Sequence, residues 1–140
     1  MRKEHVPYPV ESRSWWGGLA RLLQVGAWVD PRGCLVDFDF RALPFAPRRS
    51  FVIRDVPAGT ARGGHAHARA HQLLVCLAGT VVVELRHAGE MRQVELSDPA
   101  QALLVMAGVW ARQRYSGPEA VLMVMASEPY EADAYLPGPA

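Results

Sequence analysis

The chain has 140 residues, of which half are hydrophobic and 21% are charged, and its formal net charge is +1. This length and composition predict one globular domain with its own core, and they exclude a disordered or fibrous protein. The near-zero net charge gives no reason to expect nucleic acid as a partner.

Targeting signals are not expected in this sequence. Residues 1–16 lack the apolar stretch of a signal peptide, and no apolar run approaches the length that spans a membrane. The two cysteines, Cys34 and Cys76, form no CxxC pair, which is typical of a reducing compartment. We therefore expect a cytoplasmic protein with no membrane partner.

Short β-strands are predicted along most of the chain. Residues 1–29 are expected to form an N-terminal arm, in which segment 14–24 (SWWGGLARLLQ) is the only plausible helix, although Gly17 and Gly18 weaken it. Runs rich in Val and Leu then follow at spacings of about ten residues. Eight strands indicate a β-sandwich, jelly roll or barrel within residues 30–136, followed by a tail at 137–140. The predicted strands are residues 33–40, 51–56, 72–79, 80–87, 91–96, 101–106, 110–115 and 120–127.

Two of the predicted strands bear on assembly. In segment 80–87 apolar residues such as Val81 and Leu85 alternate with polar ones, as in a strand with one exposed face. Segments 73–78 and 120–126 are apolar on both faces, so both faces need cover. A second copy of the chain would provide it in a homodimer. An N-terminal segment folded back over its own sheet is the alternative.

Three of the five histidines, His65, His67 and His71, lie within seven positions. The spacing around them resembles the first motif of the cupin superfamily, G-x5-H-x-H-x(3,4)-E-x6-G. Gln72 stands where the family has Glu, and Ala111 stands where a second motif, P-x-G-x2-H, ends in a histidine. The resemblance implies an all-β cupin jelly roll, also called a double-stranded β-helix. The positions that match the first motif are Gly59, His65, His67 and Gly79.

The two altered positions argue against a bound metal. In metal-binding cupins both positions supply ligands, but an amide is a poor ligand and alanine is none. His65 and His67 then remain, short of the three or four donors of a stable site. His71 is adjacent to Gln72, so on an extended strand it would point to the opposite face. We expect no metal and no other cofactor. The pair could instead transfer protons, or it could be structural.

A closer resemblance comes from residues 62–67 (RGGHAH) with HQ at 71–72, which are similar to the sugar 3,4-ketoisomerase family of cupins. Segment 124–135 (VMASEPYEADAY) is similar to the ending of that family, and the resemblance spans about residues 30–136. Two positions depart from the family pattern. Ala111 follows Trp110 where the family has Trp–His, and Ala134 precedes Tyr135 where the family has Asp. These departures bear on the particular activity more than on the fold.

The resemblance implies a metal-independent isomerase of deoxysugar biosynthesis that acts on dTDP-4-keto-6-deoxyglucose. The enzyme would move the ketone from C4 to C3 through an enediol, and a histidine can take and return the proton near neutral pH. His67 would be the base, and His65 would polarise the carbonyl or shuttle a proton. No Gly-rich phosphate loop is present, so arginines would hold the pyrophosphate. The expected substrate-binding residues are Arg49, Arg54, Arg62, Gln72, Trp110 and Tyr115.

Two alternatives remain open. One is a related cupin epimerase or isomerase on another keto-sugar, which would keep the histidine pair but use different pocket residues. The other is a non-catalytic cupin that binds a sugar or a small metabolite.

Overall fold

The chain folds into antiparallel β-strands in the computed structural model, which describes residues 9–130 and 135–138. Two sheets pack face to face, with strand orders β1-β2-β10-β7-β12-β5 and β13-β6-β11-β8-β9, beside a two-stranded hairpin of β3 and β4. The strands are β1 (Val10–Trp15), β2 (Ala20–Gln24), β3 (Gly26–Asp30), β4 (Gly33–Asp37), β5 (Arg49–Ile53), β6 (Ala61–His67), β7 (Gln72–Ala78), β8 (Val81–His87), β9 (Glu90–Leu96), β10 (Gln101–Val105), β11 (Trp110–Tyr115), β12 (Val121–Ala126) and β13 (Tyr135–Leu136).

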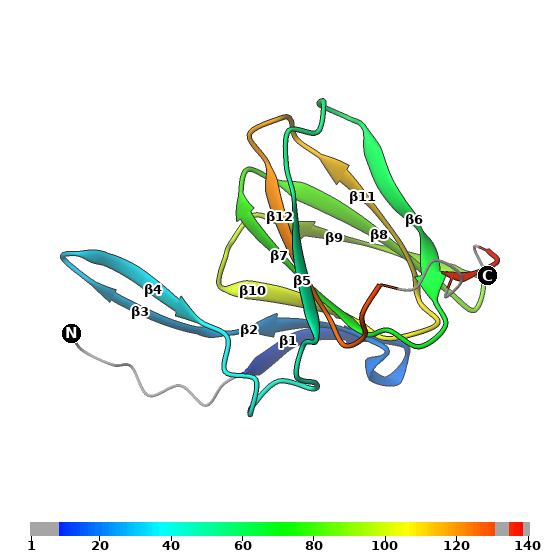
Figure 1. Ribbon diagram of the computed structural model, residues 1–140, viewed down its shortest axis with the longest axis horizontal. Coiled ribbons are helices and arrows are strands. Elements are labelled where there is room, and N and C mark those ends of the chain that lie inside the picture. Colours follow the sequence, from blue (N-terminus) through cyan, green and yellow to red (C-terminus); the bar gives the residue numbers. More distant parts are fainter. Residues whose placement is uncertain (1–8, 131–134, 139–140) are drawn as a thin grey trace.

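From β5 onward the chain crosses repeatedly between the two sheets (Figure 1). Strands β5, β7, β10 and β12 belong to the six-stranded sheet, while β6, β8, β9 and β11 belong to the five-stranded one. This alternation is the jelly-roll arrangement, so the predicted all-β cupin fold is confirmed. No helix among the described residues is long and apolar enough to cross a membrane.

Alternate residues of both sheets fill the barrel interior. In β8, Val81, Val83 and Leu85 are fully buried, whereas the residues between them are partly exposed. Leu74 and Cys76 of β7 belong to the same interior core. Burying one aliphatic side chain contributes about 1.5–3 kcal/mol, so this interior fixes how the two sheets pack.

The outer face of the six-stranded sheet is covered by the chain itself. Leu73 and Val75 of β7 point to this face and are fully buried. Phe38, Leu43 and Phe45, from the segment between β4 and β5, pack in the same cluster. The doubly apolar strands therefore give no argument for a partner subunit. Phe38, Leu43 and Phe45 follow the expected N-terminal arm, and Val25 and Ala27 of that arm pack in the same cluster.

The helix expected over residues 14–24 is wrong. A short 3-10 turn at Trp16–Gly18 separates β1 from β2, and both strands join the six-stranded sheet. Leu22 packs into the barrel interior and Leu23 into the outer cluster. A strand buried on both faces is continuously apolar, and such a short run cannot be told from a buried helix by its sequence pattern.

Candidate active site

Strand β6 places the two central histidines at one end of the barrel. His65 is directly opposite Ala111 of β11, which is in turn opposite Leu85 of β8. Directly opposed residues share one face of a sheet, and both Ala111 and Leu85 belong to the interior core. His65 and, two residues on, His67 therefore face the barrel interior.

The glycines before the histidines shape this strand. Gly63 and Gly64 have φ of 80° and 85°, values that residues with a side chain rarely adopt. They lie at a register shift against β11, and a Cβ on Gly63 would come 2.9 Å from Oε1 of Gln113. A bulge of this kind re-aims the residues that follow it, which here are the histidines.

The rings of His65, His67 and Tyr135 form a cluster. The ring centroids of the two histidines are 5.2 Å apart in an edge-on arrangement. The ring of Tyr135 lies 4.0 Å from that of His65 and 5.1 Å from that of His67. Strand β13 holds this tyrosine in place, because Tyr135 pairs with His67 and Leu136 with Ala66 across the sheet.

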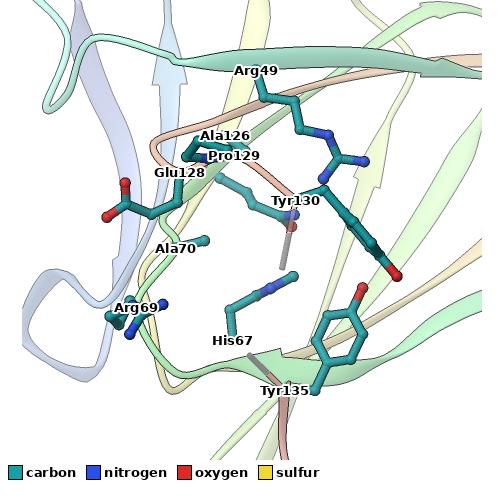
Figure 2. Close-up of a pocket in the computed structure, with 10 residues that line it drawn as sticks. Arg49, His67, Arg69, Ala70, Ala126, Glu128, Pro129, Tyr130 and Tyr135 are labelled. Atoms are coloured by element: carbon teal, nitrogen blue, oxygen red, sulfur yellow. The ribbon is translucent and has the colours of Figure 1, made fainter. Parts of the chain in front are cut away.

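The six-stranded sheet supplies the facing wall of the site. Arg49 and Gln72 both lie directly opposite Ala126 of β12, so the three share one row across the sheet. With His67 they border an open depression. Figure 2 shows the side chains of Arg49, Tyr130, Tyr135 and His67 converging on one side of this depression. Its lining residues are Arg49, His67, Arg69, Ala70, Gln72, Ala126, Glu128, Pro129, Tyr130 and Tyr135.

Burial keeps both histidines neutral. It lowers the pKa of His65, and it is also the main reason that the pKa of His67 falls to about 4, with smaller contributions from the charges of His65 and Arg49. An imidazole without its proton is the form that accepts one, so both rings are in the form of a general base at neutral pH.

Arg49 is oriented by aromatic rings. Its guanidinium lies 4.5 Å from the ring centroid of Phe51 and 5.2 Å from that of Tyr130. Such contacts are favourable for a cation. They hold the guanidinium at the pocket without neutralising its charge, so it stays available for an anionic group of a ligand.

The third histidine of the sequence cluster has a structural environment. Nδ1 of His71 accepts a hydrogen bond from the backbone N–H of Ala107 at 2.9 Å, and its ring lies 6.2 Å from that of Phe45. His71 is absent from the pocket lining. Among the described residues no group of three or more His, Cys, Asp or Glu side chains is arranged to hold a metal ion.

Four of the predicted substrate-binding residues lie away from the pocket. Arg54 is paired with Asp55 at 3.3 Å, and 74% of its side chain is exposed. Arg62 is exposed five residues before His67, roughly 16 Å away along the strand. Trp110 packs on the outer side of β11, next to inward-facing Ala111, and Tyr115 is buried in the core at the far end of β11.

The contacts of two of these residues indicate structural roles. Trp110 lies under the guanidinium groups of Arg86 and Arg112, whose Cζ atoms are 5.2 and 5.4 Å from its ring. Burial raises the pKa of Tyr115 to about 12. Both side chains are at most 6% exposed. Packing is the common fate of such aromatic residues in a barrel.

The structure adds Tyr130, Tyr135, Arg69 and Glu128 to the site. The two tyrosines lie in or beside the C-terminal segment that resembles the ketoisomerase ending, so that resemblance could have indicated them. Arg69 and Glu128 carry no comparable signal in the sequence. Only the approach of the loops after β6 and β12 brings them together.

Comparisons with known proteins agree with this arrangement. A family model described as "FdtA: WxcM-like, C-terminal" matches residues 19–139. The TDP-4-oxo-6-deoxy-alpha-D-glucose-3,4-oxoisomerase of Aneurinibacillus thermoaerophilus is 34% identical over 109 residues, which cover 77% of this chain and 78% of that protein.

Solved structures show the same fold. The sugar 3,4-ketoisomerase QdtA from Thermoanaerobacterium thermosaccharolyticum, in complex with TDP, matches with a TM-score of 0.80 at 31% identity, over 84% of this chain and 86% of that one. The TDP-quinovose 3,4-ketoisomerase WlaRB from Campylobacter jejuni matches with a TM-score of 0.78 at 28% identity, over 84% and 91%. Because the family model covers most of the chain, this chain belongs to the FdtA family of WxcM-like, C-terminal domains.

Proposed function

We propose that this protein is a TDP-sugar 3,4-ketoisomerase that moves the keto group of a TDP-4-keto-6-deoxyhexose from C4 to C3. The observation that carries the proposal is the neutral ring of His67, which borders one depression with Arg49 and Gln72, in a chain of the FdtA family. His65, two residues before it, faces the same barrel interior and its ring contacts that of His67. A relative 34% identical to this chain is named for this reaction.

The chemistry needs a base beside a carbon that is already activated. In the substrate C3 carries a hydrogen and a hydroxyl next to the C4 ketone. His67 takes the C3 proton, the C–H electron pair forms the C3=C4 bond, and O4 gains a proton to give the enediol. Loss of the O3 proton and return of a proton to C4 complete the reaction. One hydrogen moves from C3 to C4 and one from O3 to O4.

The other residues of the site have supporting roles in this proposal. His65 hydrogen-bonds the oxygen that gains charge or carries the proton between O3 and O4. Arg49 binds the diphosphate, because its guanidinium is oriented at the pocket and has the fork geometry that suits phosphate oxygens. Tyr135 packs against both imidazoles and restricts their rotation.

We further propose a metal-independent homodimer of the cytoplasm. The adjacent ketone already acidifies the C3 proton, so this reaction does not depend on a metal ion. The proposal for a dimer rests on the β3–β4 hairpin, which projects from the barrel (Figure 1).

Exchange of the substrate C3 proton with solvent tests the proposed reaction. Wild type and His67→Asn would each be incubated with TDP-4-keto-6-deoxyglucose in D₂O, and the sugar protons would be followed by NMR. We expect rapid exchange in the wild type. We expect a loss of about 10²–10⁴-fold in His67→Asn, because an amide cannot take a proton at neutral pH. Affinity for TDP, measured by calorimetry, should change little.

His71→Asn is the matched control, since His71 lies in the same loop region but outside the pocket lining. It should keep most of the exchange activity. If the wild type binds TDP but exchanges no proton, the isomerase proposal is wrong, and the protein is instead a sugar-nucleotide-binding cupin. If exchange persists in His67→Asn, His67 is not the base, although the assignment of the fold is unaffected.

A further inference from the structure

His87 ends β8 at the same end of the barrel as His67. Val83 and Leu85 are fully buried and face the interior, and the two-residue period of a strand places His87 on that face next. Strands β6 and β8 both pair antiparallel with β11. They therefore run parallel to each other, so His67 and His87, the last residues of the two strands, lie at one end.

The separation of the two histidines follows from the register. His65, Ala111 and Leu85 form one row across the sheet, and His67 and His87 lie two residues beyond it on their strands. Adjacent strands are about 4.8 Å apart, so the two backbones are roughly 10 Å from each other. The row between them falls on Val109, a buried residue of the interior core whose apolar side chain offers no hydrogen bond, and Ala111 lies two residues deeper.

The turn between β1 and β2 lies at the same end of the barrel (Figure 1). Met106 N–H donates to the carbonyl of Leu19 at 2.9 Å, and Gly108 N–H donates to the carbonyl of His67 at 2.9 Å. The short loop that starts at Met106 thus connects this turn to the end of β6. Trp16 in the turn contacts His87, with ring centroids 5.5 Å apart at 62°.

Trp16 is held in a strained conformation. It has φ of 52°, and Gly17 and Gly18 that follow have φ of 65° and 97°. For a bulky residue such a backbone is a genuine outlier, which persists when its surroundings hold it. Nε1 of Trp16 donates to Oε1 of Glu90 at 3.2 Å, and Nη2 of Arg92 donates to Oε2 of the same carboxylate at 3.1 Å. These bonds fix the indole against His87.

His87 itself has an unused polar atom. Its Nδ1 is shielded from solvent and has no hydrogen-bond partner among the residues that the structure describes. A shielded polar atom without a partner is costly, so it calls for an explanation. We propose that His87 is a substrate-binding residue that hydrogen-bonds an oxygen of the sugar, while His67 contacts the other side of the sugar. Trp16 positions the imidazole ring of His87 for this contact. This inference rests on the proposed function.

Two substitutions separate binding from packing. His87→Leu keeps an apolar side chain against Trp16 but removes the polar atom, whereas His87→Asn keeps a polar atom near the position of Nδ1 but packs less well. KM would be measured for TDP-4-keto-6-deoxyglucose, and the Kd of TDP alone by calorimetry. We expect His87→Leu to raise KM about 3- to 10-fold, the effect of losing one neutral hydrogen bond, with the Kd of TDP unchanged.

His87→Asn should stay within about threefold of the wild-type KM, because it can still make that hydrogen bond. Thermal melts check folding, and His87→Met replaces the leucine variant if the latter does not fold. Better function in His87→Leu than in His87→Asn would show a packing role and overturn the inference. So would unchanged KM in the leucine variant of an active enzyme.

Failure of the proposed function is distinguishable from failure of this inference. If the wild type exchanges no C3 proton, the isomerase proposal fails first. Calorimetry of the keto-sugar nucleotide against TDP alone then decides the role of His87. Equal affinity of wild type and His87→Leu for the keto-sugar nucleotide would reject that role.

Discussion

Single residues decide the chemistry of this site through their burial. The pKa of His67 is about 4, mainly because desolvation of the ring disfavours its charged form. The charge of Arg49, and that of His65 once it is protonated, lowers the pKa of His67 further. The ring is therefore a neutral proton acceptor throughout the physiological range. The same burial makes the folded protein sensitive to acid.

This sensitivity gives a prediction for stability. The pKa of His67 is lowered from 6.5 to about 4, so between these pH values the unfolded chain binds a proton that the folded chain does not. The free energy of unfolding should therefore fall as the pH drops from about 6.5 towards about 4. His67→Asn cannot titrate, so its loss between about pH 7 and about pH 5 should be smaller, as measured by urea denaturation.

The variant also serves as the control for other titrating groups. The carboxyl groups of Asp30, Asp39 and Glu84 have lowered pKa values as well, and they are the same in both proteins. The difference between wild type and variant thus isolates position 67. Equal losses in the two proteins would mean that His67 is not desolvated in the folded state.

Individual elements are joined by tight turns whose glycines are not equivalent. Gly79 joins β7 to β8 with φ of 66°, and a Cβ there would come 2.7 Å from Cα of Ala120. Gly89 joins β8 to β9 with φ of 77°, and a Cβ there would meet no atom within 4 Å. Both turns need a residue with a left-handed backbone conformation, but the β7–β8 turn also leaves no room for a side chain at Gly79.

Two alanine substitutions measure this difference. Gly89→Ala should destabilise the protein by about 1 kcal/mol, the cost of a left-handed conformation. Gly79→Ala should cost at least about 1 kcal/mol more, because the backbone at Ala120 must also move. Chemical denaturation gives both values. Equal effects would show that the β7–β8 turn relaxes without strain.

At the scale of the whole molecule, the β3–β4 hairpin stands apart from the barrel (Figure 1). Its two strands pair only with each other among the described elements, and a two-stranded ribbon alone is marginally stable in water. Val29 is 69% exposed and Leu35 is 55% exposed on it. These features support the homodimer that we propose, with the hairpin as the contact with the second copy.

The mass of the protein in solution tests whether the hairpin forms the dimer contact. Wild type should have twice the chain mass in light scattering at micromolar concentration, and Val29→Glu/Leu35→Glu should have the mass of one chain. A stable dimer needs roughly 1,000 Å² of buried surface. Val29 and Leu35 lie on opposite faces of the hairpin, so the double variant places a charge on whichever face meets the second copy. Val52→Glu is the control, since Val52 is also 55% exposed but lies on β5. A monomeric wild type, or a double variant that stays dimeric, contradicts this prediction.

The amino-acid sequence by itself determined the fold class, the histidine pair and eight of the strands, whereas β1, β2, β3, β6 and β13 were not among the predicted strands. Alternating and continuous apolar runs are local patterns, and the spacing of His65 and His67 fixes that both face one side of a strand. The resemblance to cupin ketoisomerases added the reaction. The short apolar run at 20–24 was ambiguous, because a doubly buried strand and a buried helix have the same pattern.

The tertiary structure alone decided which distant residues share the site. Arg49 and Gln72 meet because both strands pair with β12, whereas Arg54, five residues further along from Arg49, faces solvent beside Asp55. The approach of His87 and Trp16 depends on a turn and a strand far apart in the chain. Strand order and register are set by packing between segments that are remote in the sequence, and the local sequence pattern of a strand does not specify which strand pairs with it.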